Sequence, residues 1–330
     1  MVNSLSSGLR RVVVLGTGGT IAGRAASGGD NIGYTAGQVG VADLLGGVDA
    51  PDGVALEVEQ VAQLDSKDMG FDAWLQLAQR CVFWLSEADV VGVVITHGTD
   101  TIEETAYFLQ AVLAPGKPVV LTCAMRPASS LSPDGPQNVR DAIAVAATPG
   151  AQGVTVVCAG TVHGSLDVQK VHTYRPDAFS SGDAGPIGYV EEGAVRLLRD
   201  WPRLPVSAAL KIAATKAGAA THWPRVEIVT SHAGASGAVV DLLLQERAAG
   251  APEPIQGLVL AATGNGTVHH ALEAAALRAQ DAGVAVLRAT RCASGRILPR
   301  ADDRLRDAGA LTPVKARIAL MLELLEAAAA

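Results

Sequence analysis

The sequence predicts a two-domain α/β protein: a larger N-terminal domain with a mostly parallel sheet flanked by helices, and a smaller C-terminal α/β domain. The chain has 330 residues, more than the roughly 250–300 at which a single core tends to split. Short Val/Ile/Leu runs alternate with helical periodicity, which is typical of α/β proteins. A proline-punctuated, weakly periodic stretch interrupts this alternation once. We therefore predict domains over 1–204 and 223–330, joined by a linker over 205–222.

Four apolar runs in the first half of the chain predict strands, at 11–16, 90–96, 118–123 and 153–160. They lack polar/apolar alternation, as expected of parallel strands that are covered on both faces. The segment 101–113 has apolar residues at helical spacing, and its first turn carries Glu103 and Glu104, where the helix dipole favours acids. This βαβ pattern places a functional site at the carboxyl ends of the strands.

Beyond the predicted linker the same alternation returns. The runs VEIVTS, GLVLAAT and VAVLRAT indicate strands, and they alternate with predicted helices at 237–248, 268–281 and 313–327. The second domain is therefore expected to be a smaller α/β unit.

Composition excludes several classes of function. A hydrophobic content of 49%, with 18% charged residues, is that of a compact globular protein. The net charge of −7 argues against nucleic acid or an anionic membrane as the main partner. The sequence has no apolar run of about 18 residues, which a membrane span would need. The N-terminus reaches the first strand too soon for a signal peptide, so we expect a cytoplasmic protein.

Cysteine and histidine spacing predicts neither a metal site nor a cofactor site. The four cysteines are scattered and are expected to be buried, reduced thiols: Cys81, Cys123, Cys158 and Cys292. His269 and His270 are adjacent on a predicted helix, so their side chains should diverge by about 100°. Such a pair does not readily share one metal ion.

The loop GTGGTIAG, residues 16–23, follows the first predicted strand and could hold a phosphate or carry a reactive hydroxyl. The dinucleotide fingerprint needs Gly or Ala where Ile21 stands. The phosphate-binding P-loop needs Lys and Ser/Thr after Gly23, but Arg24 and Ala25 follow. Nucleotide binding and a purely structural turn therefore remain as weaker alternatives.

A second hydroxyl-rich loop follows the predicted strand 90–96. It contains Thr99, Asp100 and Thr101. Because both loops leave the carboxyl ends of strands of one sheet, they can face one crevice. Two threonine clusters and an acid in one place indicate hydroxyl nucleophile chemistry. The alternative for each threonine is a helix N-cap, worth about 1 kcal/mol, and Thr101 fits that role best.

Together, TGGTIAG and HGTDTIEETAYF resemble the bacterial L-asparaginase/glutaminase family of threonine amidohydrolases. Further matches follow in order: YTAGQVGV (34–41), DSKDM (65–69), AMRPASSLSPDGPQN (124–138), QKVHT (169–173), GPIGY (185–189) and ATGNG (262–266). The resemblance covers most of the chain and becomes weaker after about residue 288.

The resemblance implies that Thr20 is the nucleophile and that Tyr34 orders and activates it. Thr99, Asp100 and Lys170 would complete the catalytic group. A second set would bind the substrate: Ser66, Lys67, Gly98, Ala124 and Asn265. In the family, Ser66 matches the residue that binds the α-carboxylate. The asparagine that matches Asn265 comes from a neighbouring subunit, which implies a homotetramer of intimate dimers.

The implied reaction is hydrolysis of L-asparagine through an acyl-enzyme, with release of ammonia and then of aspartate. An aliphatic hydroxyl needs a base or a strong hydrogen-bond acceptor nearby. Lys170 could be that base only if neutral, and the adjacent Asp100 opposes the required shift, so the proton acceptor stays open. Asp100 can also pair with the substrate ammonium, and backbone N–H groups of the glycine-rich loops are candidates for the oxyanion hole.

Two positions depart from the family pattern. Lys67 stands where the family has an amide or an acid, so it must turn either into solvent or toward the substrate carboxylate beside Ser66. The segment 288–303 supplies no glutamate before Asp302, although the family often has one there. Ser66 by itself would be a cap for a helix that begins near Asp68.

Two other functions stay open beside asparagine hydrolysis. A glutaminase or another ω-amide hydrolase would use the same chemistry, because one methylene is worth only about 1–3 kcal/mol of discrimination. A binding protein for an amino acid or a nucleotide is the alternative from a different class. An amino-acid sensor would be expected to lack Thr20 or Lys170, and this chain has both.

Overall fold

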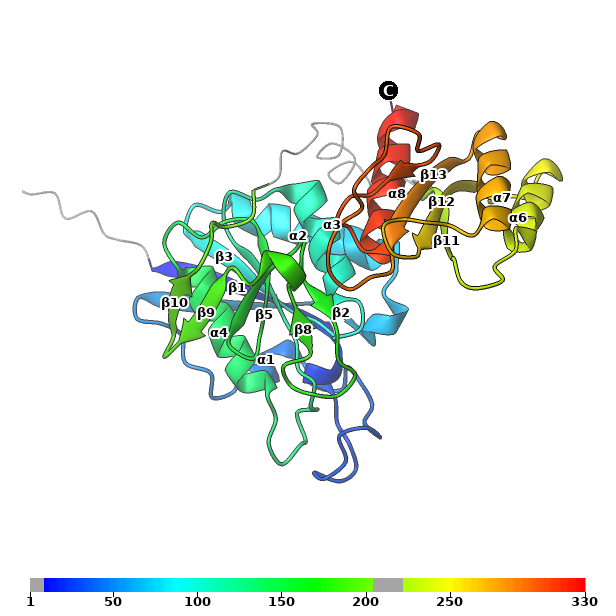
Figure 1. Ribbon diagram of the computed structural model, residues 1–330. Coiled ribbons are helices and arrows are strands. Elements are labelled where there is room, and N and C mark those ends of the chain that lie inside the picture. The colour runs from blue at the N-terminus through cyan, green and yellow to red at the C-terminus, as the bar shows by residue number, and fades with distance from the viewer. Residues whose placement is uncertain (1–8, 204–221, 330) are drawn as a thin grey trace, which may run out of the picture. The chain divides into compact units, whose positions relative to one another are not determined.

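The computed structural model describes residues 9–203 and 222–329. The chain divides into two compact units, 1–206 and 207–330, each with its own sheet (Figure 1). The predicted fold class is therefore confirmed. The predicted linker, 205–222, lies almost wholly outside the described residues, so the domain boundaries stay a prediction.

The first unit has an eight-stranded sheet. Its strands are β1 (Arg10–Gly18), β2 (Val54–Leu64), β3 (Val90–Thr96), β4 (Val119–Thr122), β5 (Val154–Cys158), β6 (Thr161–Gly164), β9 (Gly188–Glu191) and β10 (Ala194–Leu197). Their order is β10-β9-β6-β5-β4-β3-β1-β2. The strands β1 to β5 are parallel, and the last three are added antiparallel. The four predicted strands are confirmed, whereas β2 and the antiparallel strands were not predicted.

The strand order reverses beside β1. From β1 the chain moves outward to β2, and β3 then returns to the other side of β1. In this pairing Gly16 lies opposite Thr96, so the loops that follow β1 and β3 begin side by side. Such a switch point is where open α/β sheets bind their ligands.

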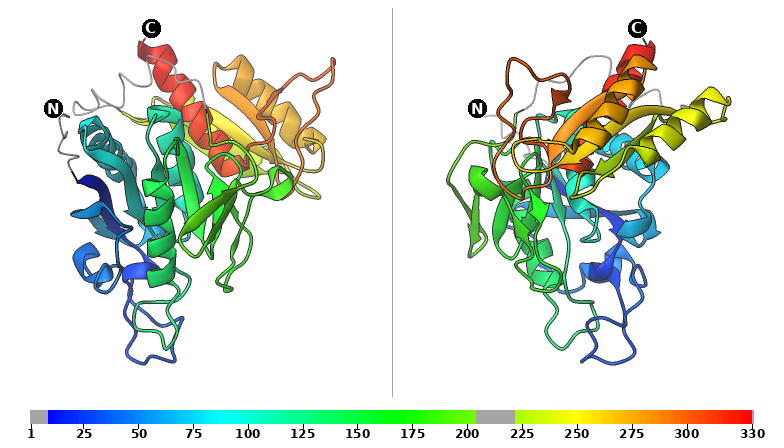
Figure 2. Two further views of the ribbon diagram at one scale, coloured as in Figure 1. Left: turned by 90° about the vertical axis from the view of Figure 1, so that its left-hand side faces the viewer. Right: turned by 45° about the vertical axis from the view of Figure 1, so that its right-hand side comes forward.

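Helices cover both faces of this sheet (Figures 1 and 2). They are α1 (Val41–Leu44), α2 (Phe71–Ser86), α3 (Ile102–Leu113) and α4 (Gly135–Ala147). Val12 and Val14 of β1 share a core with Val41 of α1 and with Val139 and Ile143 of α4. The helix α2 packs against α3 and β3. Burial on both faces explains why these strands lack polar alternation.

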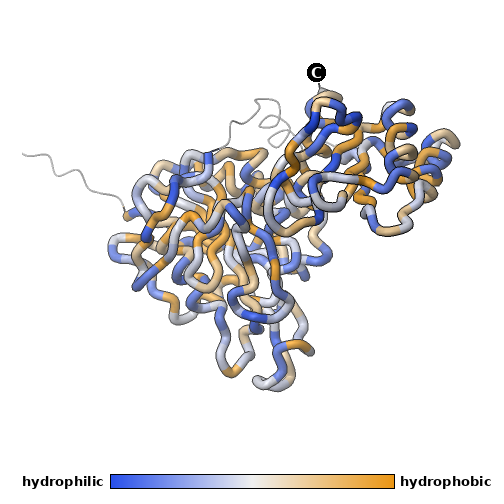
Figure 3. The backbone as a smooth tube through the Cα atoms, in the orientation of Figure 1, coloured by the Kyte–Doolittle hydropathy of each residue, from blue (hydrophilic) through white to orange (hydrophobic). Residues whose placement is uncertain are grey.

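The second unit repeats the architecture on a smaller scale. Its parallel sheet has the order β11-β12-β13-β14, with β11 (Arg225–Thr230), β12 (Ile255–Ala262), β13 (Ala285–Thr290) and β14 (Arg306–Asp307). The predicted helices are confirmed as α6 (Ala238–Ala248), α7 (His270–Asp281) and α8 (Pro313–Ala329). The apolar strand residues of each unit run through its interior (Figure 3).

Two expectations about single residues were wrong. Cys81, Cys123 and Cys158 are buried free thiols, but Cys292 is exposed, because it follows β13 in a surface loop. The rings of His269 and His270 do not diverge; they stack with centroids 4.4 Å apart. His269 is the N-cap of α7, with ψ of 133°, so helical geometry does not apply to it.

Within residues 9–203 and 222–329, no helix is long and apolar enough to cross a bilayer. Among the same residues, no three His, Cys, Asp or Glu side chains lie together as a metal site would require. The absence of a metal and of a cofactor stays a prediction.

Candidate active site

The Thr20 loop makes a tight turn directly after β1. Gly18 and Gly19 have φ of 100° and 81°, a region that glycine adopts without the steric cost of a Cβ. A 3-10 turn then begins at Thr20, which is only 7% exposed. Thr20 Oγ1 lies 2.6 Å from the hydroxyl of Tyr34. The structure therefore brings the predicted nucleophile and its predicted activating tyrosine into direct contact.

Backbone pairing holds Tyr34 in place. Arg24 and Thr35 exchange two backbone hydrogen bonds of 3.0 and 2.9 Å, which closes the segment between them into a loop. The ring of Tyr34 packs against Gly23, where a Cβ would lie 2.7 Å from Tyr34 Cδ2. Gly23 therefore allows the phenol to approach the Thr20 turn.

The second loop joins Thr99 to an ion pair. Lys170 Nζ donates to Thr99 Oγ1 at 2.8 Å and to Asp100 Oδ1 at 2.7 Å. Lys170 lies on β7 (Gln169–Lys170), which pairs with β8 (Phe179–Ser180) in a small ribbon. The lysine side chain is 19% exposed and that of Asp100 is 52% exposed, so the carboxylate remains open to a ligand. Three of the predicted catalytic residues thus form one cluster.

Close backbone contact brings the two loops together. A Cβ on Gly19 would overlap the backbone of Gly98, and a Cβ on Gly98 would overlap the hydroxyl of Ser66. The Thr20 turn, the Thr99 loop and Ser66 are therefore stacked with no room for side chains between them. Predicted catalytic and substrate-binding residues meet at the switch point of the sheet.

Neither Ser66 nor Thr101 makes the helix cap that was its alternative role. Ser66 Oγ accepts from the backbone N–H of Asp100 at 3.2 Å, and the next α-helix begins only at Phe71. Thr101 is in the N-cap position of α3, but its hydroxyl donates to the Ser66 carbonyl at 2.7 Å and makes no cap. Both hydroxyls join the loops of the site, so a long-range contact replaces the local one.

A buried histidine supports the second loop, and sequence reasoning missed it. Burial lowers the pKa of His97 to about 4, so the ring is neutral at pH 7. His97 Nδ1 donates to the Gly98 carbonyl at 2.7 Å, and Thr105 Oγ1 donates to Nε2 at 2.9 Å. Trp74 Nε1 donates in turn to Thr105 Oγ1 at 2.9 Å. The one sign of this role in the sequence was the position of His97, between the end of a predicted strand and Gly98.

Lys67 is turned toward two neighbouring carboxylates. Its Nζ lies 2.8 Å from Asp65 Oδ2 and 3.1 Å from Asp68 Oδ2, and its side chain is 61% exposed. The hydrogen bonds that Lys67 donates to these two acids raise its pKa. Of the two orientations expected from the sequence, the structure has the one that faces solvent.

The contacts described above do not include the other two predicted substrate-binding residues. Ala124 follows β4 and is fully buried beside α4. Asn265 lies in the second unit, where its amide accepts from Leu298 N at 2.7 Å and donates to Leu298 O at 3.1 Å. In that unit the loop without a glutamate is held by an ion pair of 2.8 Å between Arg288 and Asp303.

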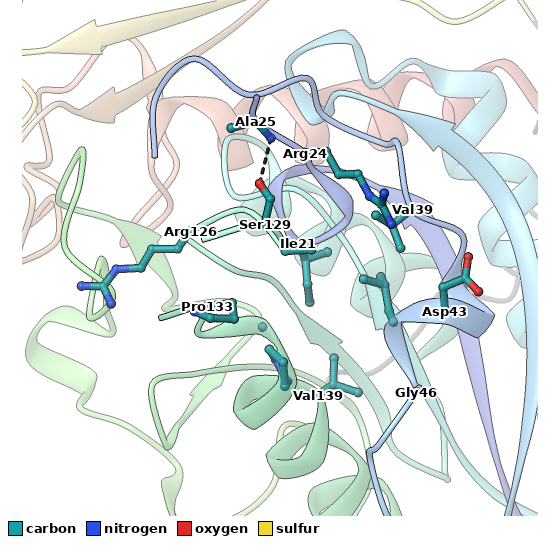
Figure 4. A pocket seen from close by; sticks show the side chains of 14 residues that line it. Ile21, Arg24, Ala25, Val39, Asp43, Gly46, Arg126, Ser129, Pro133 and Val139 are labelled. Carbon is teal, nitrogen blue, oxygen red and sulfur yellow. Dashed lines mark hydrogen bonds between the residues drawn. The ribbon is translucent and has the colours of Figure 1, made fainter. Parts of the chain in front are cut away.

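A pocket of about 430 Å³ adjoins the back of the Thr20 turn. Ile21, Arg24 and Ala25 line one side of it, and Arg126 and Ser129 line another (Figure 4). Ser129 Oγ accepts from Ala25 N at 2.8 Å across its edge. The predicted catalytic residues do not line this pocket, so it is separate from the cluster of hydroxyls and charges.

The fold and the site define the chain as an α/β amidohydrolase, and comparison with known families makes this specific. The asparaginase N-terminal family model matches residues 11–203, and the glutaminase/asparaginase C-terminal domain model matches residues 225–328. The chain belongs to the asparaginase family.

Similar proteins cover almost the whole chain. L-asparaginase 2 of Escherichia coli is 36% identical over 329 residues, covering 96% of this chain and 89% of that protein. Glutaminase-asparaginase of Pseudomonas fluorescens is 35% identical over 325 residues, covering 96% of this chain and 86% of that protein. The crystal structure of a probable cytoplasmic L-asparaginase from Campylobacter jejuni is similar, with a TM-score of 0.84 at 35% identity. That match covers 96% of this chain and 95% of the other.

Proposed function

We propose that the protein hydrolyses the side-chain amide of L-asparagine to L-aspartate and ammonia, with Thr20 as the nucleophile. The observation that carries this proposal is the 2.6 Å hydrogen bond between Thr20 Oγ1 and the Tyr34 hydroxyl. The Thr20 turn packs directly on the loop of Thr99 and Asp100, which supplies the charges that an amino-acid amide requires.

In the first step Thr20 Oγ1 attacks the amide carbon and forms the C–O bond of an acyl-enzyme. The C–N bond breaks, and the Thr20 proton, relayed through the Tyr34 hydroxyl, goes to the leaving nitrogen and completes ammonia. A hydroxyl attacks through a lone pair while its proton is held by an acceptor. The Tyr34 hydroxyl lies at hydrogen-bond distance from Thr20 Oγ1, whereas Lys170 donates to other groups. We therefore assign the proton-accepting contact to Tyr34.

In the second step water attacks the same carbon and frees aspartate and the Thr20 hydroxyl. The contact between Lys170 Nζ and Thr99 Oγ1, 2.8 Å long, orients the Thr99 hydroxyl where this water would lie. Backbone N–H groups of the two glycine-rich loops would stabilise the oxyanion of both steps. Removing one such donor typically costs about 100- to 1000-fold in rate.

Ser66 and Asp100 fit the two charges of a free amino acid. The proposal assigns the substrate α-carboxylate to the Ser66 hydroxyl and the α-ammonium to the exposed Asp100 carboxylate. The bond between Ser66 Oγ and Asp100 N, 3.2 Å long, keeps the two groups adjacent. Lys67 forms ion pairs with Asp65 and Asp68, so its charge is partly compensated before substrate binds.

Glutamine is the second candidate substrate, because the relatives include both an L-asparaginase and a glutaminase-asparaginase. Ammonia release from L-asparagine, L-glutamine and D-asparagine distinguishes the cases. We expect kcat/KM to be highest for L-asparagine. A higher value for L-glutamine would reassign the substrate, and the absence of ammonia release from all three would overturn the proposed activity.

We also propose a cytoplasmic homotetramer in which Asn265 of one copy completes the site of another. The two hydrogen bonds between Asn265 and the backbone of Leu298 would then hold the loop that reaches the neighbouring site. Mixing inactive Thr20→Ala subunits with inactive Asn265→Ala subunits should restore part of the activity, because some hybrid sites would carry both intact residues. Fully active monomers on a sizing column would contradict this assembly.

A further inference from the structure

The motif AMRPASSLSPDGPQN, residues 124–138, contributes only Ala124 to the proposed site, although it links β4 to the first turn of α4. Residues at the C-terminal end of this motif contact the segment at its beginning. Three residues there, Asp134, Gly135 and Asn138, each contact a segment that borders the site. Their roles do not follow from the proposed chemistry.

Asp134 occupies the N-cap position of α4 but does not cap it. An aspartate in that position normally accepts from the N–H groups of its own helix, and here no such side-chain bond forms. Its two oxygens instead accept from the consecutive N–H groups of Met125 and Arg126, at 3.0 and 2.9 Å. The carboxylate therefore holds the turn that follows Ala124.

Asn138 holds the other side of the same turn. It is 2% exposed, and its Nδ2 donates to the Cys123 carbonyl at 2.9 Å. Its Oδ1 accepts from Ala159 N at 2.9 Å, which ties the end of β4 to the end of β5. Ala124 thus lies between two anchored peptides, one on each side.

Gly135 connects this assembly to the nucleophile. A Cβ on Gly135 would lie 2.9 Å from Cγ1 of Ile21 and 3.5 Å from Cβ of Ala124. Ile21 immediately follows Thr20 in the 3-10 turn. The first turn of α4 therefore contacts both the Thr20 turn and the turn after β4, and it sets the spacing between them.

We propose that Asp134 is a positioning residue for amide hydrolysis: by clamping the turn after β4 to the first turn of α4, it fixes that turn relative to Thr20. This inference rests on the proposed function. It assigns to Asp134 the attack geometry rather than the binding of the amino-acid head group, which Ser66 and Asp100 provide.

The test is Asp134→Asn in the full-length protein. An amide has one acceptor oxygen and directs an NH2 group at the second backbone N–H, so one of the two clamping bonds is lost. Because displacements of about 1 Å can cost about 100-fold in rate, we expect kcat for L-asparagine to fall by about tenfold or more. The inhibition constant of L-aspartate should stay within about twofold, since its contacts are those of Ser66 and Asp100.

The control is Gln137→Ala, in the same turn of α4. Gln137 Nε2 donates to Asp141 Oδ1 at 2.8 Å within the helix, so its loss should leave kcat unchanged. Gly135→Ala approaches the same contact from the other side and should reproduce the fall in kcat, even if Asp134→Asn folds poorly.

Three outcomes are decisive against the positioning role. An unchanged kcat in both Asp134→Asn and Gly135→Ala overturns it. A parallel loss of kcat, aspartate binding and thermal stability shows a structural role and overturns it as well. A wild-type protein without amidase activity removes the proposed function, and the positioning role falls with it.

Discussion

The two loops at the switch point of the sheet hold their threonines in different ways. Thr20 Oγ1 contacts the Tyr34 hydroxyl, whereas Thr99 Oγ1 accepts from Lys170 Nζ and lies 3.4 Å from an Asp100 carboxylate oxygen. A nucleophilic hydroxyl must keep one lone pair free to attack the substrate. A hydroxyl that only orients a water molecule or a charged group has no such requirement. The difference supports the proposed assignment of attack to the first loop and of electrostatic support to the second.

The supports beneath the two loops differ as well. The Thr20 turn rests on two glycines with positive φ and on Ile21, which is buried. The Thr99 loop rests on a neutral histidine within a hydrogen-bonded chain. Steric fit fixes the conformation of the first loop, and polar contacts fix that of the second. Substitutions in the two loops should therefore affect stability and activity in different ways.

The largest expected effect comes from Thr20→Ala. We expect kcat to fall by at least about 1000-fold with normal folding, because the hydroxyl that forms the acyl-enzyme is lost. Mass spectrometry of quenched wild-type enzyme should locate the acyl adduct on Thr20. An adduct on Thr99 would reverse the assignment of the two loops.

Thr17→Ala is the matched control in the same loop. Thr17 is 2% exposed and donates to the Thr96 carbonyl at 2.9 Å, a contact within the scaffold. Its loss should lower the free energy of unfolding by about 1–3 kcal/mol and change kcat by less than about tenfold.

The second prediction concerns Lys170→Met. Removal of the ammonium leaves Thr99 without its donor and Asp100 without its ion-pair partner, so kcat should fall by about 100-fold. The control is Lys117→Met, because Lys117 Nζ donates to the carbonyls of Leu85 and Glu87 at 3.0 and 2.8 Å. That variant should lose stability and keep kcat. Equal losses of kcat in both variants would show that Lys170 is only structural.

The third prediction tests the polar support of the second loop. The pKa of His97 is about 4 in the folded protein and near 6.5 in the unfolded chain, so the unfolded chain binds the proton at higher pH. Stability is therefore lost as pH falls through this window, by up to about 3 kcal/mol between pH 6.5 and 4. Urea unfolding of wild type and His97→Gln at several pH values checks this. Equal pH slopes for the two proteins would contradict it.

The smallest expected effect is that of Lys67→Gln. Loss of the ammonium frees Asp65 and Asp68 and makes this side of the site more negative, which favours the substrate ammonium. We expect KM for L-asparagine to fall by about two- to threefold with little change in kcat, because ground and transition states share this contact. A KM that rises severalfold would show that Lys67 binds the substrate carboxylate.

Much of the fold follows from the sequence where burial is two-sided. The continuous apolar runs predicted β1, β3, β4 and β5, since helices cover both faces there. β2 was missed because VALEVEQVAQL mixes acids and amides with apolar residues and so contains no continuous apolar run; most of its residues are only half-buried. The short antiparallel strands were missed because four residues give too little periodicity.

The candidate site was predictable where a motif carries its own chemistry, as in the loops of Thr20 and Thr99. The orientation of Lys67 depends on the rotamers of Asp65 and Asp68, which sequence spacing does not determine. The clamp made by Asp134 depends on the turn of a serine- and proline-rich loop. Contacts of this kind form only when the chain has folded, so local patterns give no sign of them.

The exposure of Cys292 has a practical consequence for labelling. Cys292 is exposed, whereas the other three cysteines are buried. Burial also raises the pKa of Cys81 to about 12, which suppresses the reactive thiolate. A maleimide dye should therefore attach to the native protein at one place, in the loop after β13. Wild-type protein then becomes a fluorescence reporter, in which energy transfer between donor- and acceptor-labelled copies would measure subunit exchange in the proposed tetramer without any engineered residue.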